Sequence, residues 1–262
     1  MVMQLTKSIF IGAHPDDVVI GAGNFIKNTN KFNETNFYIL LTNGATSFSQ
    51  DYPVVISDSQ IYHTPKEYSF QRLREDEEAI KKLGISSDRV FKFGLNDQET
   101  YKNIPFIVSE LEKIISKINP DRIFTHSFPE AHPDHEIVCF CTHYALSRLK
   151  KSDEIDVFEY PQYIINETGE RINRTFLDSK DVVEFELEPN EIDFKKKLFL
   201  IYDSQPDLVE RYLNKNEQFR LTMRSANEFN GYSDYISPWI RELKPYIVKN
   251  EIENFLRFEN EK

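Results

Sequence analysis

Ser8-Ile9-Phe10-Ile11-Gly12 is an apolar run that passes directly into the polar cluster Ala13-His14-Pro15-Asp16-Asp17. A short apolar run that ends in polar turn residues predicts a buried strand, which we place over residues 7–12. Residues 18–30 carry apolar side chains at helical spacing, and Asp16 and Asp17 stand before them as good helix caps. The chain therefore opens with a strand, a polar turn and a helix.

The same alternation of strand and helix continues for about 150 residues. Further strands are predicted at 37–42, 89–93 and 122–125, and helices at 66–83 and 104–118. Gly84 and the pair Asn119-Pro120 are typical helix-terminating residues and end those two helices. This pattern predicts an α/β fold, with a Rossmann-like, mostly parallel sheet flanked by helices.

The pattern changes in the last part of the chain. A strand is predicted at 157–160, a β-hairpin from 174–177 and 182–187, and helices at 191–202 and 207–229. We interpret residues 151–262 as a C-terminal β-hairpin and helical elaboration of a core at about 7–150. Because no internal repeat and no convincing linker separates the two parts, we expect one domain over residues 1–262.

Composition narrows the classes of function. The 262 residues include 43 acidic and 32 basic side chains, a net charge of −11. Nucleic-acid binding is not expected, because phosphate neutralisation needs clustered Lys and Arg, and nothing predicts attraction to an anionic membrane. No run approaches the roughly 18 apolar residues of a membrane-spanning helix, and residues 1–7 lack the pattern of a signal peptide.

The two cysteines, Cys139 and Cys141, lie two positions apart in a predicted helix. Their side chains would point to different faces of that helix, which is a poor arrangement for a disulfide. Reduced thiols that fill small apolar spaces are typical of cytoplasmic proteins, so we expect a cytoplasmic location. Nothing in the sequence indicates an oligomeric state.

Residues 45–65 form a polar, Ser-rich and Tyr-containing stretch between a predicted strand and a predicted helix. This stretch is long for a connector in a compact domain, and long connectors often serve as lids or substrate loops. We therefore predict a candidate lid or substrate loop in this part of the chain.

A second polar cluster, His132-Pro133-Asp134-His135, follows the strand at 122–125, and His126 stands at the end of that strand. Parallel sheets bind ligands beyond the carboxyl ends of their strands, so both clusters are expected on the same edge. Histidine and aspartate are ligands of zinc and other divalent transition metals. One such cluster alone would indicate a surface turn, but two on one sheet edge predict a catalytic metal centre.

Together the two clusters resemble the motifs of the PIG-L/LmbE-like zinc-dependent de-N-acetylases, which remove an acyl group, usually acetyl, from an N-acetylglucosamine unit. Weaker similarity lies at Arg72-x-x-Glu75 with Ala79 and Leu83-Gly84, at Gly94-Leu95-Asn96-Asp97, at Tyr202-x-Ser204-Gln205 and at Glu228-Phe229. The resemblance covers about residues 7–230. It implies a small N-acetylated sugar, or a conjugate of one, as the substrate.

By position, the resemblance implies that His14, Asp17 and His135 hold Zn²⁺ or another divalent ion. It also implies that Asp16 is the general base and that His132 assists the oxyanion or the leaving amine. General chemistry agrees with this division. A metal ion lowers the pKa of water towards about 7, a neighbouring carboxylate can take the remaining proton, and the metal and a cationic imidazole can both stabilise an oxyanion.

Other polar residues have weaker assignments. Asp134 is expected to orient a neighbouring histidine, to cap the helix that follows, or to do both. Arg72, Asp97 and His126 are candidate substrate contacts, because sugar hydroxyls need both donors and acceptors.

The chain departs from the resemblance at one position and has a spacer of its own. The family's first motif usually continues with glutamate, where this chain has Val18. We infer that this change leaves the metal ligands intact and alters a contact around them. The spacer Phe128-Pro129-Glu130-Ala131 predicts no substrate preference.

Three other functions are considered, and the motifs favour each of them less. A metal site of this type can cleave a non-sugar amide or a phosphoester, although phosphoester sites usually gather a second metal and we find no second ligand set. A non-catalytic sugar-binding relic would be expected to lack one of the predicted functional residues, and all five are present. A nucleotide-cofactor oxidoreductase is disfavoured because Gly21-Ala22-Gly23 lies inside a predicted helix rather than at a strand-to-helix turn.

Overall fold

Strands and helices alternate along most of the chain. The structure is a computed structural model that describes residues 6–32, 34–45, 52–165, 168, 170–176, 179–222, 224–225, 229 and 245–260. Its strands are β1 (Lys7–Gly12), β2 (Thr35–Thr42), β3 (Val54–Ser57), β4 (Gln60–Tyr62), β5 (Val90–Leu95), β6 (Arg122–His126), β7 (Asp156–Tyr160), β8 (Tyr163–Ile165), β9 (Arg171–Asn173), β10 (Val182–Phe185) and β11 (Glu217–Thr222). Its helices are α1 (Asp17–Lys31), α2 (Pro65–Lys82), α3 (Ile104–Ile118), α4 (Pro133–Arg148), α5 (Pro189–Phe199), α6 (Leu208–Tyr212) and α7 (Pro245–Asn260), with the 3-10 helices η1 (Ser87–Arg89) and η2 (Thr100–Asn103).

The main sheet has seven strands in the order β10-β11-β7-β6-β1-β2-β5. The five strands from β7 to β5 are parallel, and β11 and β10 extend the sheet in the antiparallel sense. The chain passes from β1 to β2 and β5 on one side, and it later returns to β6 and β7 on the other. The order therefore reverses between β1 and β6, and open parallel sheets bind ligands beyond the strand ends at such a switch point.

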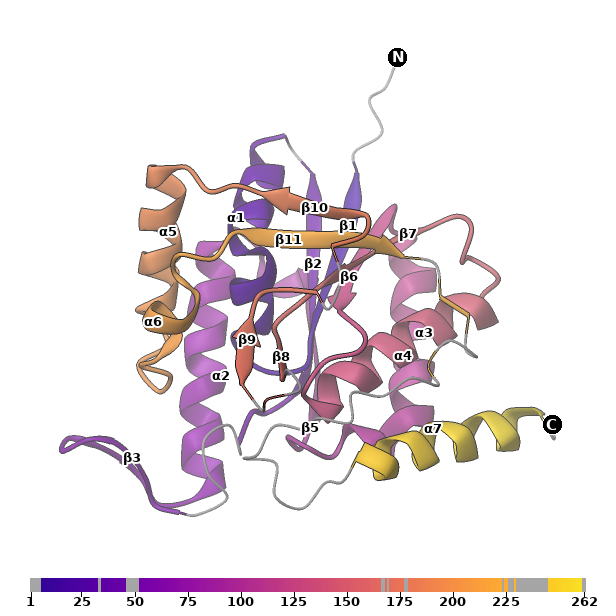
Figure 1. Ribbon diagram of the computed structural model, residues 1–262, viewed down its shortest axis with the longest axis horizontal. Coiled ribbons are helices and arrows are strands. Elements are labelled where there is room, and N and C mark those ends of the chain that lie inside the picture. Colours follow the sequence, from indigo (N-terminus) through magenta and orange to yellow (C-terminus); the bar gives the residue numbers. More distant parts are fainter. Residues whose placement is uncertain are drawn as a thin grey trace.

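Alternate side chains of β1 face two separate hydrophobic clusters. Ile9 and Ile11 are buried in a cluster with side chains of α3, α4 and α7, whereas Phe10 packs with side chains of α1, α2 and α5. Figure 1 shows these two groups of helices on opposite sides of the sheet. Because both faces are covered, Ile9, Phe10 and Ile11 form a continuous apolar run instead of alternating between apolar and polar residues.

The predicted fold class, a mostly parallel α/β sheet flanked by helices, is confirmed. The helix predicted at 104–118 has the same bounds as α3, and Gly21-Ala22-Gly23 lies inside α1 as predicted. Both cysteines are buried and free, as expected. Among the described residues, no helix is long and apolar enough to cross a membrane. The assignment of one domain to residues 1–262 stays a prediction.

The C-terminal elaboration differs from the prediction. Residues 207–229, predicted as one helix, instead contain the short helix α6 and the strand β11. β10 pairs with β11 and not with residues 174–176, the described part of the predicted partner, so the predicted hairpin is wrong. A hairpin does form nearby, from β8 and β9. In β11, Glu217 and Phe219 are buried while their neighbours are less so, which is the two-residue period of a strand rather than the period of a helix.

Helix α1 is interrupted at Ala22, and two side chains of the C-terminal elaboration bind the backbone groups that the interruption leaves unpaired. The backbone of Ala22 is not helical (φ −146°, ψ 17°), so hydrogen bonds of the helix are broken there. Glu217 accepts hydrogen bonds from the N–H groups of residues 24 and 25, both at 2.8 Å. Arg174 donates one to the carbonyl of Gly21 at 3.1 Å. The interrupted backbone is therefore satisfied by side chains that lie about 150 to 200 positions later in the sequence.

Candidate metal centre

The two polar clusters meet at the switch point between β1 and β6. Residues 13–17 leave the end of β1, and the second cluster follows the end of β6. The N–H of Ala13 donates to Nε2 of His126 at 3.1 Å. Thr42, at the end of β2, holds the Ala13 carbonyl through its N–H (2.9 Å) and its hydroxyl (2.8 Å). Three neighbouring strand ends thus fix the turn that carries the first cluster.

The three predicted ligands present their donor atoms to one another. His14 Nδ1 lies 3.2 Å from Asp17 Oδ2 and 3.2 Å from His135 Nε2, and the last two atoms are 3.6 Å apart. A tetrahedral ion with ligand bonds of about 2.0–2.1 Å needs ligand atoms about 3.3 Å apart. All three side chains are buried. The donor set therefore fits one divalent transition metal ion.

The other nitrogen of each imidazole faces a carboxylate. His135 Nδ1 lies 2.5 Å from Glu130 Oε2, and His14 Nε2 lies 3.1 Å from both Asp97 Oδ1 and Asp134 Oδ2. Metal-ligating histidines are commonly oriented in this way, because the carboxylate fixes the ring and makes the ligating nitrogen more basic. Both histidines therefore have the surroundings expected of metal ligands.

Asp134 lies behind His14 and ties it to η2. Besides its contact with His14, its carboxylate accepts hydrogen bonds from the N–H of Gln98 (2.7 Å) and from the hydroxyl of Thr100 (2.6 Å). The histidine that it contacts is His14, from the other cluster, and the N-cap position of α4 is occupied by His132. The structure therefore supports the orienting contact and not the capping role.

Asp16 has an unusual backbone and a buried charge partner. It is the N-cap residue of α1, but its φ of 99° lies in the left-handed region and its side chain makes no capping hydrogen bond. The carboxylate instead pairs with Arg72 Nη2 at 3.0 Å. Burial raises the pKa of Asp16 to about 7, against the opposing charge of Arg72. Strained backbone of this kind is found mainly at functional sites.

The imidazole of His132 is held in a neutral form. Its Nδ1 accepts a hydrogen bond from the N–H of Asp134 at 3.2 Å, which leaves the ring proton on Nε2. Burial and the nearby rings of His14 and His135 lower the pKa of His132 well below its usual value. The hydrogen bond at Nδ1 favours a neutral imidazole with its proton on Nε2, and the role of His132 in the reaction stays a prediction.

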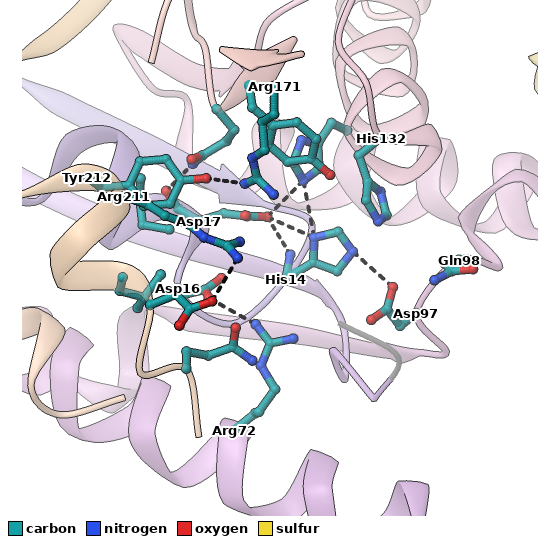
Figure 2. Close-up of a pocket in the computed structure, with 17 residues that line it drawn as sticks. His14, Asp16, Asp17, Arg72, Asp97, Gln98, His132, Arg171, Arg211 and Tyr212 are labelled. Carbon is teal, nitrogen blue, oxygen red and sulfur yellow. Dashed lines mark hydrogen bonds and ion pairs between the residues drawn. The ribbon is translucent and has the colours of Figure 1, made fainter. Parts of the chain in front are cut away.

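These side chains lie in one pocket, which Figure 2 shows in close-up. His14, Asp17 and His135 line it together with Asp16 and His132. Asp97 and Gln98 lie on one side, and Arg211 and Tyr212 lie on the side away from them. Residues of the C-terminal elaboration, on β8, β9 and α6, therefore complete a pocket whose other residues come mainly from the core.

The sequence profile of the PIG-L family, described as GlcNAc-PI de-N-acetylase, matches residues 9–146, which is more than half of the chain. The chain belongs to the PIG-L family. The matched region runs from β1 to α4 and contains both polar clusters.

Two curated relatives and one solved structure show the extent of the similarity to this PIG-L chain. A probable N-acetyl-alpha-D-glucosaminyl L-malate deacetylase 2 of Bacillus cereus is 28% identical over 142 residues, covering 53% of this chain and 60% of that protein. A diacetylchitobiose deacetylase of Thermococcus kodakarensis is 27% identical over 138 residues, covering 50% and 46%. The chain therefore spans about half the length of the curated relatives that it matches. The structure of N,N'-diacetylchitobiose deacetylase from Pyrococcus horikoshii superposes with a TM-score of 0.59 at 21% identity, covering 83% of this chain and 84% of that one, which shows a shared fold.

Val18, where the PIG-L motif usually has glutamate, is part of the hydrophobic core. Its side chain is 1% exposed and belongs to the cluster that packs against one face of the sheet. Val18 therefore adds apolar contacts to this cluster, and the donor atoms of the predicted ligands still converge.

Glu130 is a site residue of this PIG-L chain that the sequence did not reveal. Its Oε2 contacts His135, and its Oε1 accepts hydrogen bonds from the Ser127 hydroxyl (2.9 Å) and from the N–H of Gln162. Burial raises the pKa of this carboxyl, but the charges of His135 and His126 outweigh burial and bring the pKa down to about 2. The only sequence signal was a carboxylate in the spacer between two histidines.

Two predicted substrate contacts have different surroundings from those expected. His126 is fully buried, and its Nε2 lies 3.2 Å from Asp17 Oδ2 behind the three donor atoms. It does not line the pocket, so the prediction that His126 contacts the substrate is wrong.

Arg72 does line the pocket, but it is 1% exposed and donates to the carbonyls of Gly44 and Pro15 as well as to Asp16. These contacts favour a positioning role for Arg72. Asp97 lines the pocket and contacts His14.

Further groups of donor atoms among the described residues correct the expectation that no second ligand set exists. One of them, Cys139, His143 and Glu159, shares no residue with the first set, and its Glu159 pairs with Arg224.

Another group overlaps the first set. One atom each of His14, Asp97, His132 and Asp134 lies within 4.8 Å of the others. This group shares His14 with the first set, and Asp134 already accepts hydrogen bonds from η2 and its N-terminal flank. The arrangement therefore resembles an orienting network around His14 more than a second metal site.

The predicted lid lies only partly within the described residues, because 46–51 are outside them. Residues 52–65 contain the β3–β4 hairpin, which Figure 1 shows projecting from the body near one end of α2. No residue of this described part lines the pocket. A lid role for the stretch stays a prediction.

Proposed function

We propose that this protein is a metal-dependent hydrolase that removes an N-acyl group, usually acetyl, from an N-acetylglucosamine-type sugar or its conjugate. One observation carries the proposal: the donor atoms of His14, Asp17 and His135 converge within 3.2–3.6 Å in a pocket that Asp16 and His132 also line. Membership of the PIG-L family and the names of both curated relatives support the same reaction.

We assign the metal to His14, Asp17 and His135. Two imidazole nitrogens and one carboxylate oxygen are a common donor set of catalytic zinc, although other divalent transition metals accept the same donors. When bound, such an ion supplies Lewis acidity, which polarises an amide carbonyl and makes water acidic enough to react near neutral pH.

Asp16 is the residue that moves protons. Its carboxylate faces the pocket, and the buried guanidinium of Arg72 fixes its position. We assign Asp16 to accept a proton from the attacking water and to deliver it to the amide nitrogen, so that the C–N bond breaks to acetate and the free amine.

His132 is the second catalytic residue. Its Nε2–H, set by the hydrogen bond at Nδ1, is available to donate to the amide oxygen as that atom becomes negatively charged. A neutral donor in a buried site serves this purpose because the N–H dipole is already oriented before the reaction.

Glu130→Gln is expected to weaken metal binding by about 10–100-fold, because an orienting carboxylate makes the ligating nitrogen of a histidine more basic. The variant keeps the shape of the side chain, but its NH2 replaces one of two oxygens that accept hydrogen bonds, so some loss of stability is expected. Thermal unfolding in saturating metal shows whether the fold is kept. Competition with a chelator measures the affinity. Glu78→Gln, at an exposed position of α2, is the matched control. An affinity equal to that of the control would rule out the orienting role.

Hydrolysis of N-acetylglucosamine and its glycosides tests the proposed function directly. Acetate release should stop after removal of metal with a chelator and return when zinc, iron, cobalt or manganese is added. Activity that persists without metal would contradict the metal role. Release of phosphate from phosphoesters, or cleavage of non-sugar amides only, would contradict the substrate class.

We also propose a cytoplasmic location, which the two free, buried thiols support.

A further inference from the structure

We propose that the substrate carries a carboxylate or phosphate group and that Arg171 and Arg211 bind it. Both arginines line the pocket, and both belong to the C-terminal elaboration, Arg171 on β9 and Arg211 on α6. The inference rests on the proposed function, because it specifies the substrate of the same pocket.

Arg171 is held by a fixed set of aromatic and polar neighbours. Its guanidinium lies 3.8 Å from the centroid of the Tyr163 ring and donates to the Tyr212 hydroxyl at 2.5 Å. It also donates to Asn173 at 2.7 Å. Both tyrosines are almost completely buried, so their rings do not shift easily. A guanidinium fixed in this way loses little freedom when it binds an oxyanion.

Arg211 is partly exposed. It pairs with Asp207 at 2.7 Å, one helical turn away, and the two side chains are 35% and 44% exposed. An exposed ion pair of this spacing is weak, because water screens it and both side chains lose freedom in forming it. A carboxylate or phosphate that also contacts Arg171 can therefore compete with Asp207 and with the other partners of this guanidinium.

Arg171 and Arg211 lie on the same side of the pocket. Arg211 lies on the side away from Asp97, and Arg171 approaches near Tyr212 (Figure 2). The chain as a whole has more acidic than basic residues and a net charge of −11, so two neighbouring arginines in one pocket wall are a local excess of positive charge. Carboxylates also line the pocket, Asp97 opposite the arginines and Asp207 paired with Arg211, so we infer that an anionic substituent is bound by the two guanidinium groups themselves.

Arg72 does not belong to this subsite. It is buried, and Asp16 and two backbone carbonyls accept its hydrogen bonds. Arg72 orients the proposed general base. Arg171 and Arg211 instead contact residues of α6, of its N-terminal flank and of the β8–β9 hairpin.

The test compares neutral and anionic sugars on the metal-loaded, full-length protein. The probes are N-acetylglucosamine as the neutral parent, its 1-phosphate and 6-phosphate, and N-acetylmuramic acid as a carboxylate. At least one anionic probe should have a kcat/KM about tenfold or more above that of the parent, since hydrogen bonds to charged groups are worth about that factor or more. In Arg171→Gln and Arg211→Gln this ratio should fall towards one, and in Arg171→Lys it should fall partly, because lysine keeps the charge and loses the planar fork.

Arg74→Gln is the matched control, because it removes the same charge from an exposed position on α2 outside the pocket. The preference for the anionic probe should be unchanged in this variant, and in the wild type it should decline as ionic strength rises. Equal or lower kcat/KM for every anionic probe, or a preference that survives both glutamine substitutions, would overturn the inference.

Binding measurements separate this inference from the proposed function. If no probe is hydrolysed, the deacetylase proposal fails, and calorimetric titration of the same sugars still tests the arginines. Tighter binding of an anionic probe that both glutamine variants abolish would support the subsite. Equal affinity for neutral and anionic probes would refute it, whatever the turnover.

Discussion

Asp16→Asn is expected to reduce kcat for deacetylation by about 10²–10⁴-fold, the usual contribution of a general base. Asparagine has nearly the same shape but cannot accept and deliver the proton. Asp16 is not one of the three converging donors, so metal content should equal that of the wild type. Steady-state acetate release combined with elemental analysis measures both quantities in one preparation.

The ion pair between Asp16 and Arg72 means that the effect of this variant on the fold has to be measured as well. Asp16→Asn leaves the buried guanidinium without its carboxylate partner, so some loss of stability is expected. Thermal unfolding of each preparation shows whether the fold is kept. An Asp16→Asn protein that is folded, contains metal and hydrolyses the substrate at the wild-type rate would refute the assignment of Asp16.

Asp17→Ala is expected to abolish stoichiometric metal binding and to lower turnover by about 10³-fold or more. The change removes one of three ligands, and the Lewis acid that they hold contributes several kcal/mol to such a reaction. The loss of affinity should exceed the roughly 10–100-fold expected for Glu130→Gln, because Glu130 acts through His135. Elemental analysis after dialysis against buffered metal is the direct measurement.

Asp17 has a structural role that this experiment has to separate from ligation. Its Oδ2 also accepts the N–H of His14 at 2.7 Å, which helps to shape the turn. Asp17→Asn keeps an oxygen for that hydrogen bond and removes the charge, so it should fold normally and bind metal weakly. His63→Ala, an exposed histidine remote from the pocket, should retain full metal content. Normal metal content in both Asp17 variants would disprove the ligand set.

Most of the core, and the convergence of the proposed metal ligands, could be predicted because their signals are local in the sequence. Apolar runs gave the strands, and each polar cluster stood directly after a strand or before a helix. The parallel order of the strands then required His14 and His135 to lie on one edge. In such a fold, residues about 120 positions apart can be placed together without any knowledge of side-chain packing.

The missed features depend on contacts that no local pattern encodes. Glu130 is one carboxylate among 43 acidic residues, and only the path of the spacer brings it against His135. The sequence predicts helix across the residues of β11, whereas the pairing of this segment with β7 and β10 makes it a strand. Arg171 and Arg211 reach the pocket through the β8–β9 hairpin and α6, whose placement follows from the same long-range pairing.

The interruption in α1 bears on how the protein can be divided. A fragment that stops at residue 150 would retain all the proposed metal ligands and both proposed catalytic residues, but it would lack Arg174 and Glu217. The amides of residues 24 and 25 and the carbonyl of Gly21 would then lose their partners, only a few residues beyond Asp17. The region that the family profile covers is therefore unsuited to expression as a minimal enzyme, and engineered or shortened versions should keep the chain at least through β11.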